Sequence, residues 1–402
     1  MHLRYALLKE YSESQKQNLK KGYLILTGKS PRKHMQWVIN TADPEKPALA
    51  IPQHVIEDYE QDKSRNSVDL LKMLGKENEV PCFYLTDEKG NITDFGHTAL
   101  FRKRYSWSVC DHVPKKLNPE KDANEVNDIV EAIFGKLGHW AGRVYFEDAE
   151  LQTNGANLFM DEATLKILSS PKPTCFQHYL EQPSGTNTSK NDLRHWDSEA
   201  TIRGYKMYWH RNTHGREDDF GWKEKGPLPK NDSQHTHPVK PVQPGAQFKG
   251  RIRFENLTPV ELGALLFSLD LPEGCCHKVG LGKPYGLGSI AIQADLVLVD
   301  RPTRYSKLFD GENWFLSEEK DNGSIGSYKK KFERFVLSSI GEDNLTSLWD
   351  NERMKELRAM FSFSGCTSDA WLEKTKYLQV GSDEYRNRNV LPKPGEVRDS
   401  SK

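Results

Sequence analysis

The fold is clearest in residues 247–299, which read QFKGRIRFENLTPVELGALLFSLDLPEGCCHKVGLGKPYGLGSIAIQADLVLV. The first nine residues alternate between polar and non-polar side chains. The non-polar positions are Phe248, Gly250, Ile252 and Phe254. Alternation with this period is typical of a strand that is buried on one face only, so the sequence predicts a half-buried strand here.

A helix is predicted to begin directly after this strand. Thr258 can cap it, Pro259 suits its first position, and Glu261 completes a capping box. A glycine-rich loop follows, and residues 289–299 then form an apolar run that predicts one long strand. Strand, helix, loop and strand in this order make up half of an α+β sandwich of the ferredoxin type.

Shorter patterns predict further elements on either side of this segment. Apolar runs predict strands at residues 23–27, 81–86 and 143–148. Helical spacing predicts helices within residues 51–75, 122–134 and 328–360, the second of them ended by Gly135. Between residues 182 and 245 the chain is rich in Gly, Pro, Ser, Asn and His, with a strand-like island at 202–209, and this indicates a long insertion.

The charges are balanced over the chain as a whole but not along it. The 402 residues include 57 Lys and Arg and 57 Asp and Glu, which gives a formal net charge of zero. This excludes a protein that holds nucleic acid through bulk charge, but not one with a local basic groove. Residues 203–253 contain 11 basic and 5 acidic residues, an excess of 11 − 5 = +6. This region is either a positive surface for an anionic partner or a solvated loop.

Composition also bears on the compartment and on metals. No apolar run approaches the roughly 18 residues of a membrane helix, and the first residues have too short an apolar stretch for a signal peptide. The six cysteines include no C-x-x-C pair. We therefore expect a cytoplasmic protein with reduced thiols and no membrane partner. Zinc is not expected, although Cys275, Cys276 and His277 are ligand types.

The glycine-rich loop is the sharpest local motif. It reads HKVGLGKPYGLGS from His277 to Ser289. Such a loop lets the backbone approach another group closely and leaves N–H groups free to bind a phosphate. A Walker A loop is excluded, because Pro284 follows Lys283 where that motif needs Ser or Thr. A dinucleotide-binding loop is excluded because it would lead into a helix. A tight helix-to-strand turn stays the alternative.

Residues 280–288 resemble the C-terminal glycine-rich signature of the RAMP superfamily, the repeat-associated proteins of CRISPR–Cas effector complexes. Other segments resemble further blocks of a large RAMP subfamily with an extended C-terminus. In chain order these blocks are residues 133–135, 141–149, 170–180, 202–210, 254–263 and 389–394. An early Ile-Pro-Gly-Ser-Ser-Leu-Arg-Gly block, present in many RAMP proteins, has no counterpart here.

The resemblance implies a guide-RNA-binding backbone subunit of a type III CRISPR effector complex. Its partners would be guide RNA, target RNA and other subunits of the complex. It also implies an RRM-like core within residues 1–300, carrying the basic insertion at about 182–245, and a partly helical extension at 301–402.

The residues implied in RNA binding are basic side chains, for phosphates, and loop glycines. The predicted set is Arg102, Arg104, Arg143, Arg203, Lys206, Lys278, Gly280, Gly282, Lys283, Gly286 and Gly288. Aromatic residues interleave with the arginines and lysines near 102–107 and 203–211, as single-stranded RNA binding requires.

Two alternative functions stay open. The first is a metal-dependent endoribonuclease, in which Asp87, Asp94 or Asp111 would act at the scissile phosphate together with Mg²⁺. Each of these aspartates can also be interpreted as a turn or cap residue. Histidines of the insertion, such as His210 and His214, are candidates for general acid–base chemistry on RNA. The second alternative is a non-catalytic scaffold that joins neighbouring subunits.

Overall fold

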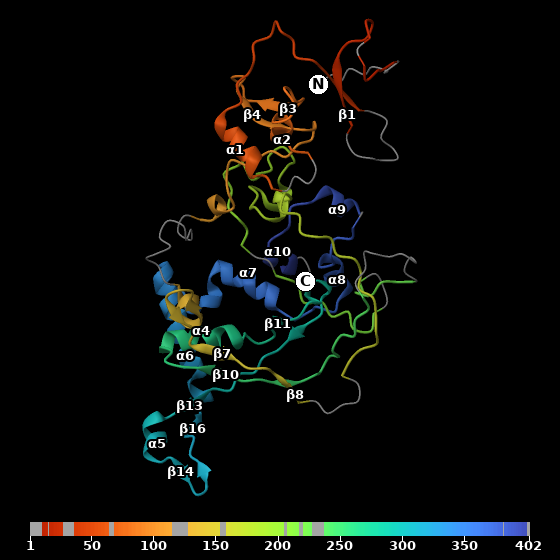
Figure 1. Cartoon of the computed structure of the whole chain (residues 1–402). Coiled ribbons are helices and arrows are strands. Elements are labelled where there is room, and N and C mark those ends of the chain that lie inside the picture. Colours follow the sequence, from red (N-terminus) through yellow and green to blue (C-terminus); the bar gives the residue numbers. More distant parts are fainter. Residues whose placement is uncertain are drawn as a thin grey trace. The chain divides into compact units, whose positions relative to one another are not determined.

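The computed structural model describes residues 10–14, 16–26, 36–63, 68–114, 128–152, 158–204, 207–216, 220–226, 237–380 and 382–399. The chain forms two compact units, residues 1–106 and 107–402 (Figure 1). The boundary lies inside the range 1–300, for which the sequence predicts one RRM-like domain. Residues 301–402 belong to the second unit.

The first unit is a small α+β assembly. Its elements are β1 (Gly22–Ile25), β2 (Trp37–Asn40), α1 (Gln53–Gln61), α2 (Leu70–Leu74), β3 (Phe83–Thr86) and β4 (Ile92–Gly96). β1 pairs with β2 and β3 with β4, both antiparallel. The core joins α1 to β4 through Tyr59 and Phe95, whose rings stack with centroids 4.5 Å apart, and it also includes Val55 and Leu70.

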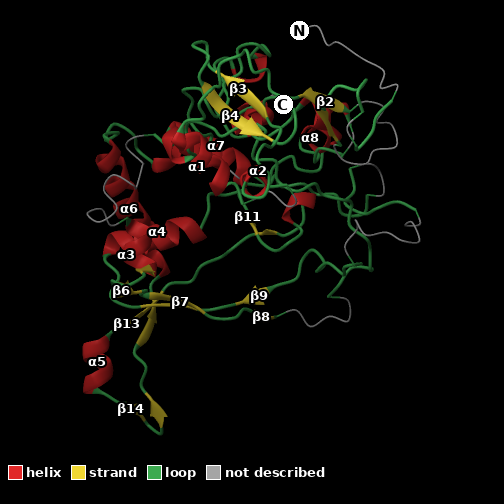
Figure 2. Cartoon of the chain, turned by 45° about the horizontal axis from the view of Figure 1, so that its top comes forward, coloured by secondary structure: helices red, strands yellow, loops and turns green. Residues whose placement is uncertain are grey.

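The second unit contains short strands in antiparallel pairs. The strands are β5 (Gly135–Lys136), β6 (Trp140–Ala141), β7 (Val144–Phe146), β8 (Glu150–Leu151), β9 (Phe248–Lys249), β10 (Ile252–Phe254), β11 (His277–Lys278), β12 (Ser289–Ile290), β13 (Val297–Val299), β14 (Phe309–Asp310), β15 (Asn313–Trp314) and β16 (Glu318–Lys320). The pairs are β5–β6, β7–β10, β8–β9, β11–β12, β13–β16 and β14–β15. Over the described residues every sheet has two strands, and long loops connect them (Figure 2).

The second unit also contains helices. They are α3 (Ile129–Phe134), α4 (Pro259–Leu269), α5 (Arg301–Ser306), α6 (Ile325–Ile340), α7 (Glu352–Phe361), α8 (Asp369–Lys374), α9 (Asp383–Asn387) and α10 (Pro394–Asp399). The chain is therefore an α+β protein with small antiparallel sheets. No helix of the described residues is both long enough and apolar enough to cross a membrane.

The central helix α4 is specified by local signals. The Thr258 side chain accepts a hydrogen bond from the Glu261 N–H, the Glu261 carboxylate accepts one from the Thr258 N–H, and Pro259 is the first helical residue. Most of α4 is buried, and α6 packs against it. At Gly263 an added Cβ would lie 2.2 Å from the backbone oxygen of Tyr328, so this approach of α6 requires glycine.

The predicted elements agree with the structure where the sequence signals are local. The strand at 81–86, the capped helix at 258, the helix ended by Gly135 and the helical region after residue 328 are confirmed. The predicted helix region at 51–75 contains two short helices, α1 and α2. Residues 122–127 lie outside the described residues.

Two strand predictions are wrong. The sequence predicts one strand over residues 289–299, but β12 pairs with β11 and β13 with β16, and residues 291–296 between them form no strand. Between β12 and β13 the chain passes from one pairing strand to another, and Leu296 is buried there against residues of α4. In the segment 202–209, Ile202 forms only an isolated bridge with Leu180, and residues 205–206 lie outside the described part.

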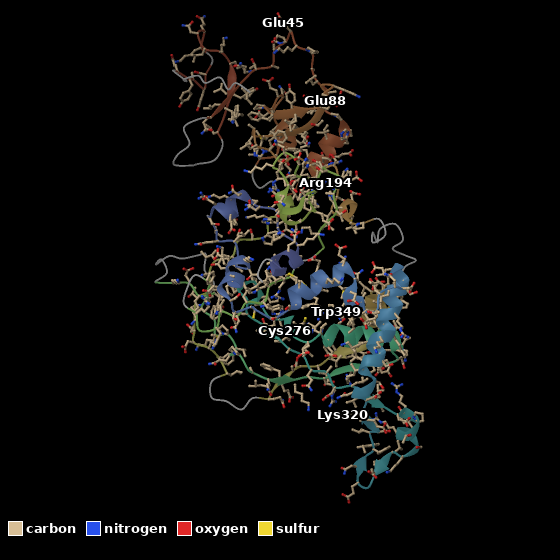
Figure 3. The ribbon with its side chains drawn as sticks, turned by 180° about the vertical axis from the view of Figure 1, so that it is seen from behind. Glu45, Glu88, Arg194, Cys276, Lys320 and Trp349 are labelled. Atoms are coloured by element: carbon tan, nitrogen blue, oxygen red, sulfur yellow. The ribbon has the colours of Figure 1, made fainter. Side chains whose placement is uncertain are left out.

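A slender projection leaves the second unit at β13 and β16 (Figures 1 and 2). This arm, residues 297–320, consists of that strand pair, α5 and the β14–β15 hairpin. Lys320 marks its base in Figure 3. Phe309 and Trp314 pack ring against ring, with centroids 4.5 Å apart, yet they are 51% and 68% exposed.

Candidate nucleic-acid interface

The strand pairs β7–β10 and β8–β9 form one antiparallel ribbon. Val144 pairs with Phe254, Tyr145 with Arg253 and Phe146 with Ile252. The ribbon continues because the Glu147 N–H donates to the Arg251 carbonyl over 3.0 Å, and β8 then pairs with β9. Because side chains alternate along a strand, one face of this ribbon packs on the core and the other does not.

The inner face of the ribbon packs against helices. Val144, Ile252 and Phe254 join Ile133 of α3 and Leu265 of α4 in one hydrophobic cluster. Helices therefore cover this face, as Figure 1 shows for α4 and α6 beside β7 and β10. This packing fixes the direction of the alternate side chains.

The outer face carries a basic row, defined as Lys249, Arg251 and Arg253. All three side chains are exposed. They are spaced two residues apart, about 7 Å from one to the next at the rise of an extended strand. The Arg253 guanidinium pairs with Glu147 over 3.0 Å and lies 5.8 Å from the centre of the Tyr145 ring. An exposed ion pair of this kind contributes at most about 1 kcal/mol, so a phosphate can replace Glu147.

One aromatic ring shares the face of the basic row: Tyr145, which pairs with Arg253, is 45% exposed. Phe146, which pairs with Ile252, and Phe248 have the parity of the other face, and they are 62% and 52% exposed. An exposed ring beside a row of cations suits single-stranded nucleic acids, since a base can stack on the ring while phosphates contact the cations. The ribbon can therefore hold an extended anionic chain.

The glycine-rich loop has a closed base and an open tip. At the base the Val279 N–H donates to the Gly288 carbonyl over 2.8 Å, and the Leu287 N–H to the Gly282 carbonyl over 3.2 Å. At the tip Leu281 is 99% exposed. Within the described residues, the N–H groups of Gly280, Leu281 and Gly282 have no hydrogen-bond acceptor. Such consecutive free donors favour an anion.

Two glycines of the loop are required by close contacts. Gly288 has φ +72°, and a Cβ there would lie 1.9 Å from the Val279 oxygen. Gly286 has φ +92°, and its Cβ would lie 2.7 Å from the Cβ of Arg211. Gly282 would contact Leu287, whereas Gly280 faces open space. The loop therefore packs directly on the segment around Arg211.

The lysines of the loop differ in environment. The Lys278 ammonium donates to the Gly286 carbonyl over 2.7 Å and to the Leu287 carbonyl over 3.0 Å. Burial is the main cause that lowers the pKa of Lys278, to about 8. Lys278 thus holds the loop closed from within, whereas Lys283 begins a short 3-10 turn, Lys283–Tyr285, and is half-buried.

Arg143 connects residues 141–149 with residues 254–263 and with α3. Its guanidinium donates to the Ala132 carbonyl over 2.8 Å, to the Asn256 carbonyl, and to the Glu261 carboxylate. Burial alone would raise the pKa of Glu261, but hydrogen bonds from Arg143 and Thr258 outweigh it and hold that pKa below its usual range. The structure thus gives Arg143 an internal, bridging position.

Arg203 has a similar internal position. It donates to the carbonyls of Leu391 and Pro392, over 2.6 and 2.7 Å, and so ties the 202–210 block to the 389–394 block. Burial lowers the pKa of its guanidinium. Lys206, the next predicted RNA contact, lies outside the described residues.

His210 supports the glycine-rich loop. It is fully buried, and its Nδ1 lies 2.8 Å from Ser289 Oγ while its Nε2 lies 2.9 Å from the carbonyl oxygen of Cys276. Figure 3 labels Cys276. Burial, its largest cause, lowers the pKa of His210 to about 4, so the ring is neutral at ordinary pH. This assigns His210 to packing of the loop base; His214 is exposed.

The remaining predicted RNA contacts, Arg102 and Arg104, belong to the first unit. Both line a pocket there, and Arg104 forms an ion pair with Asp58 of α1. The ribbon belongs to the other compact unit.

The three candidate catalytic aspartates have different surroundings. Asp87 accepts three hydrogen bonds from Lys89 and Asn91 in the β3–β4 turn, and the Asn91 amide is the main cause that lowers its pKa. Asp111 accepts from the N–H and hydroxyl of Ser108, which lower its pKa in the same way. Asp94 lines the pocket of the first unit.

The structure does not gather these aspartates. In the part of the chain that is described, no three His, Cys, Asp or Glu side chains lie where they could share a metal ion. All six cysteines are free thiols. Turn formation accounts for the hydrogen bonds of Asp87 and Asp111.

The basic row was missed by the sequence analysis, although the signal was present. The alternation that assigned Phe248, Ile252 and Phe254 to the inner face assigns Lys249, Arg251 and Arg253 to the other.

Comparison with known proteins adds no relative: no protein-family model matches the chain, and no curated protein does.

Proposed function

We propose that the chain is an RNA-binding subunit of a type III CRISPR guide-RNA effector complex. One structural observation carries the RNA-binding part: a ribbon with helices packed on one face presents Lys249, Arg251 and Arg253 on the other, beside the exposed Tyr145 ring. An RRM-type sheet binds single-stranded RNA with this same division of faces. We accordingly propose that α3, α4 and the ribbon belong to an RRM-like core.

The family part of the proposal depends on the ordered RAMP-like blocks. Its structural support is that several of these blocks contact one another: Arg143 joins 141–149 to 254–263, and Arg203 joins 202–210 to 389–394. His210 also contacts Ser289, the residue that follows block 280–288. Guide RNA, target RNA and neighbouring subunits are then the partners, and the cytoplasm is the compartment.

RNA titrations at several salt concentrations test the RNA-binding part. The variant K249Q/R251Q/R253Q should bind a labelled single-stranded RNA more weakly than the wild type. Each phosphate contact contributes about 0.7 to the slope of log K against log salt for single strands, so removing three should reduce that slope by about 2. The readout is fluorescence anisotropy of the RNA.

A matched control removes the same charge elsewhere. K330Q/K331Q/R334Q neutralises three exposed side chains of α6 and should change neither affinity nor slope. Equal effects of the two triple variants would contradict a specific role for the basic row. The family part has its own test: repeat-derived guide RNA should co-purify with the chain from its native cells, and its absence would contradict this assignment.

The two alternative functions have less support. Metal-dependent cleavage needs side chains that bind the metal ion together, and the described residues contain no such cluster. The scaffold has one observation in its favour, the exposed Phe309–Trp314 pair on the arm. If the wild-type chain fails to bind RNA in the titration, the scaffold replaces the leading proposal.

A further inference from the structure

A pocket of about 560 Å³ opens within the first unit. Three segments form its wall: α1 with the residues that follow it, β4, and residues 97–104. The volume lies in the range of about 300–1,000 Å³ that is common for small-ligand sites. All of its lining belongs to one unit, so its shape does not depend on the other unit.

Asp94 is the unusual group in this wall. Its Oδ2 is buried and has no hydrogen-bond partner among the described residues. Asp87, seven residues earlier, has both carboxylate oxygens engaged. A buried acceptor without a donor is rare in folded proteins and calls for a missing partner. For this oxygen to meet a donor in the pocket, the carboxylate has to turn about its last bond, a torsion that is broad for aspartate.

Basic side chains lie in the same pocket wall as the acidic Asp94. Arg102, Lys103 and Arg104 line the pocket in sequence, and all three are exposed. Arg104 is oriented by its ion pair with Asp58. Cationic side chains that are exposed at a pocket are suited to a phosphate. A ligand that fits must therefore carry both N–H donors and an anionic group.

Apolar side chains complete the lining. Val55, Phe95 and Phe101 contribute to the wall, and they suit a flat ring between the two polar ends. A metal ion would fit these residues less well, because the described carboxylates Asp58, Asp62 and Asp94 do not gather with a common ligand geometry.

We propose that this pocket binds a guanine nucleotide, with Asp94 accepting hydrogen bonds from the base and the Arg102–Arg104 segment facing the phosphate. An ionised carboxylate only accepts hydrogen bonds. Guanine offers it two adjacent donors, the ring N1–H and the 2-amino group. Adenine and cytosine place an acceptor nitrogen beside their amino group, and uracil places carbonyls on both sides of its N–H. The carboxylate thus selects guanine.

Calorimetric titration of the full chain with mononucleotides tests this assignment. GMP should bind roughly 10- to 100-fold more tightly than AMP, CMP or UMP, the discrimination of one bidentate base contact. IMP keeps the ring N–H but lacks the amino group, so its affinity should be intermediate. Guanosine, without phosphate, should bind more weakly than GMP. All of these comparisons use the unaltered protein.

Two variants test whether Asp94 causes the preference for guanine. D94N replaces one acceptor oxygen by an amide donor and should abolish the preference for GMP over AMP. E88Q makes the same change at an exposed residue of the β3–β4 turn, labelled in Figure 3, and should leave the preference unchanged. Equal affinities for the four nucleotides, a guanine preference that survives in D94N, or no GMP binding at millimolar concentration would each overturn the proposal. Because the titration uses free nucleotides, its result is independent of RNA binding by the basic row.

Discussion

Basic side chains of this protein divide into two groups according to what their donors already contact. Arg143, Arg203 and Lys278 donate to backbone carbonyls and are partly or largely buried. Burial of a cation is unfavourable unless its hydrogen bonds are satisfied, and here carbonyl oxygens satisfy them. Arg251 and Lys249 are exposed instead. The first group holds segments together, and the second group can exchange solvent for phosphate.

Lys278 should make stability depend on pH in the alkaline range. Its folded pKa is about 8 against an ordinary value of 10.5. Between these values the unfolded chain binds more protons at this site than the folded chain, so stability rises as pH rises. Allowing for partial solvent exposure, we expect a gain of about 1–2 kcal/mol from pH 8 to pH 10.5. K278M should lack this gain, which urea unfolding at both pH values would measure.

Lys283→Met is the matched control for that experiment, because it changes the same residue type in the same loop. Its pH profile should follow the wild type. A K278M profile that also follows the wild type would show that the buried ammonium is not the titrating group.

The glycine-rich loop combines two different requirements for glycine. Gly288 needs both a positive φ and the absence of a Cβ, since that atom would lie 1.9 Å from the Val279 oxygen. Gly280 needs only the positive φ of +84°, because nothing lies within 4 Å of its added Cβ. The cost of a positive φ and the cost of a close Cβ contact can therefore be measured separately within one loop.

Alanine at these two positions should have unequal effects. We expect G280A to lower the free energy of unfolding by about 1 kcal/mol through backbone conformation alone. G288A should lower it by about 3 kcal/mol or more, because the loop base must also open. Denaturant unfolding measures both values, and RNA titration should show weaker binding for G288A than for G280A. Equal losses of stability would mean that the base of the loop is not held by the Val279–Gly288 contact.

The sequence predicted those elements whose signals are local. Thr258, Pro259 and Glu261 specify the start of α4 through contacts within four residues, and the structure confirms them. The prediction of one strand over residues 289–299 was wrong, because β12 and β13 pair with different strands outside this segment, β11 and β16. The outer face of the ribbon could have been predicted from alternation alone. The pocket could not, because α1, β4 and residues 97–104 meet only in three dimensions.

Each unit contains its own candidate binding surface and its own core. The first unit has the pocket and the cluster around Val55, Tyr59 and Phe95. The second unit has the ribbon and the cluster around Val144 and Leu265. A protein organised in this way can bind two ligands without requiring that one core change when the other is occupied.

This organisation predicts two separate thermal transitions. Val55→Ala removes buried apolar volume from the first core, and Arg143→Ala leaves Glu261 without its guanidinium in the second unit. Each change should cost about 1–3 kcal/mol. In scanning calorimetry V55A should lower the midpoint of the smaller first unit by roughly 5 °C or more, and R143A should lower that of the larger second unit by a few degrees. V55A should leave the other transition in place, and so should R143A. A single transition that both variants shift by similar amounts would show that the two units unfold as one cooperative body, and the pocket and the ribbon would then be energetically coupled through the fold.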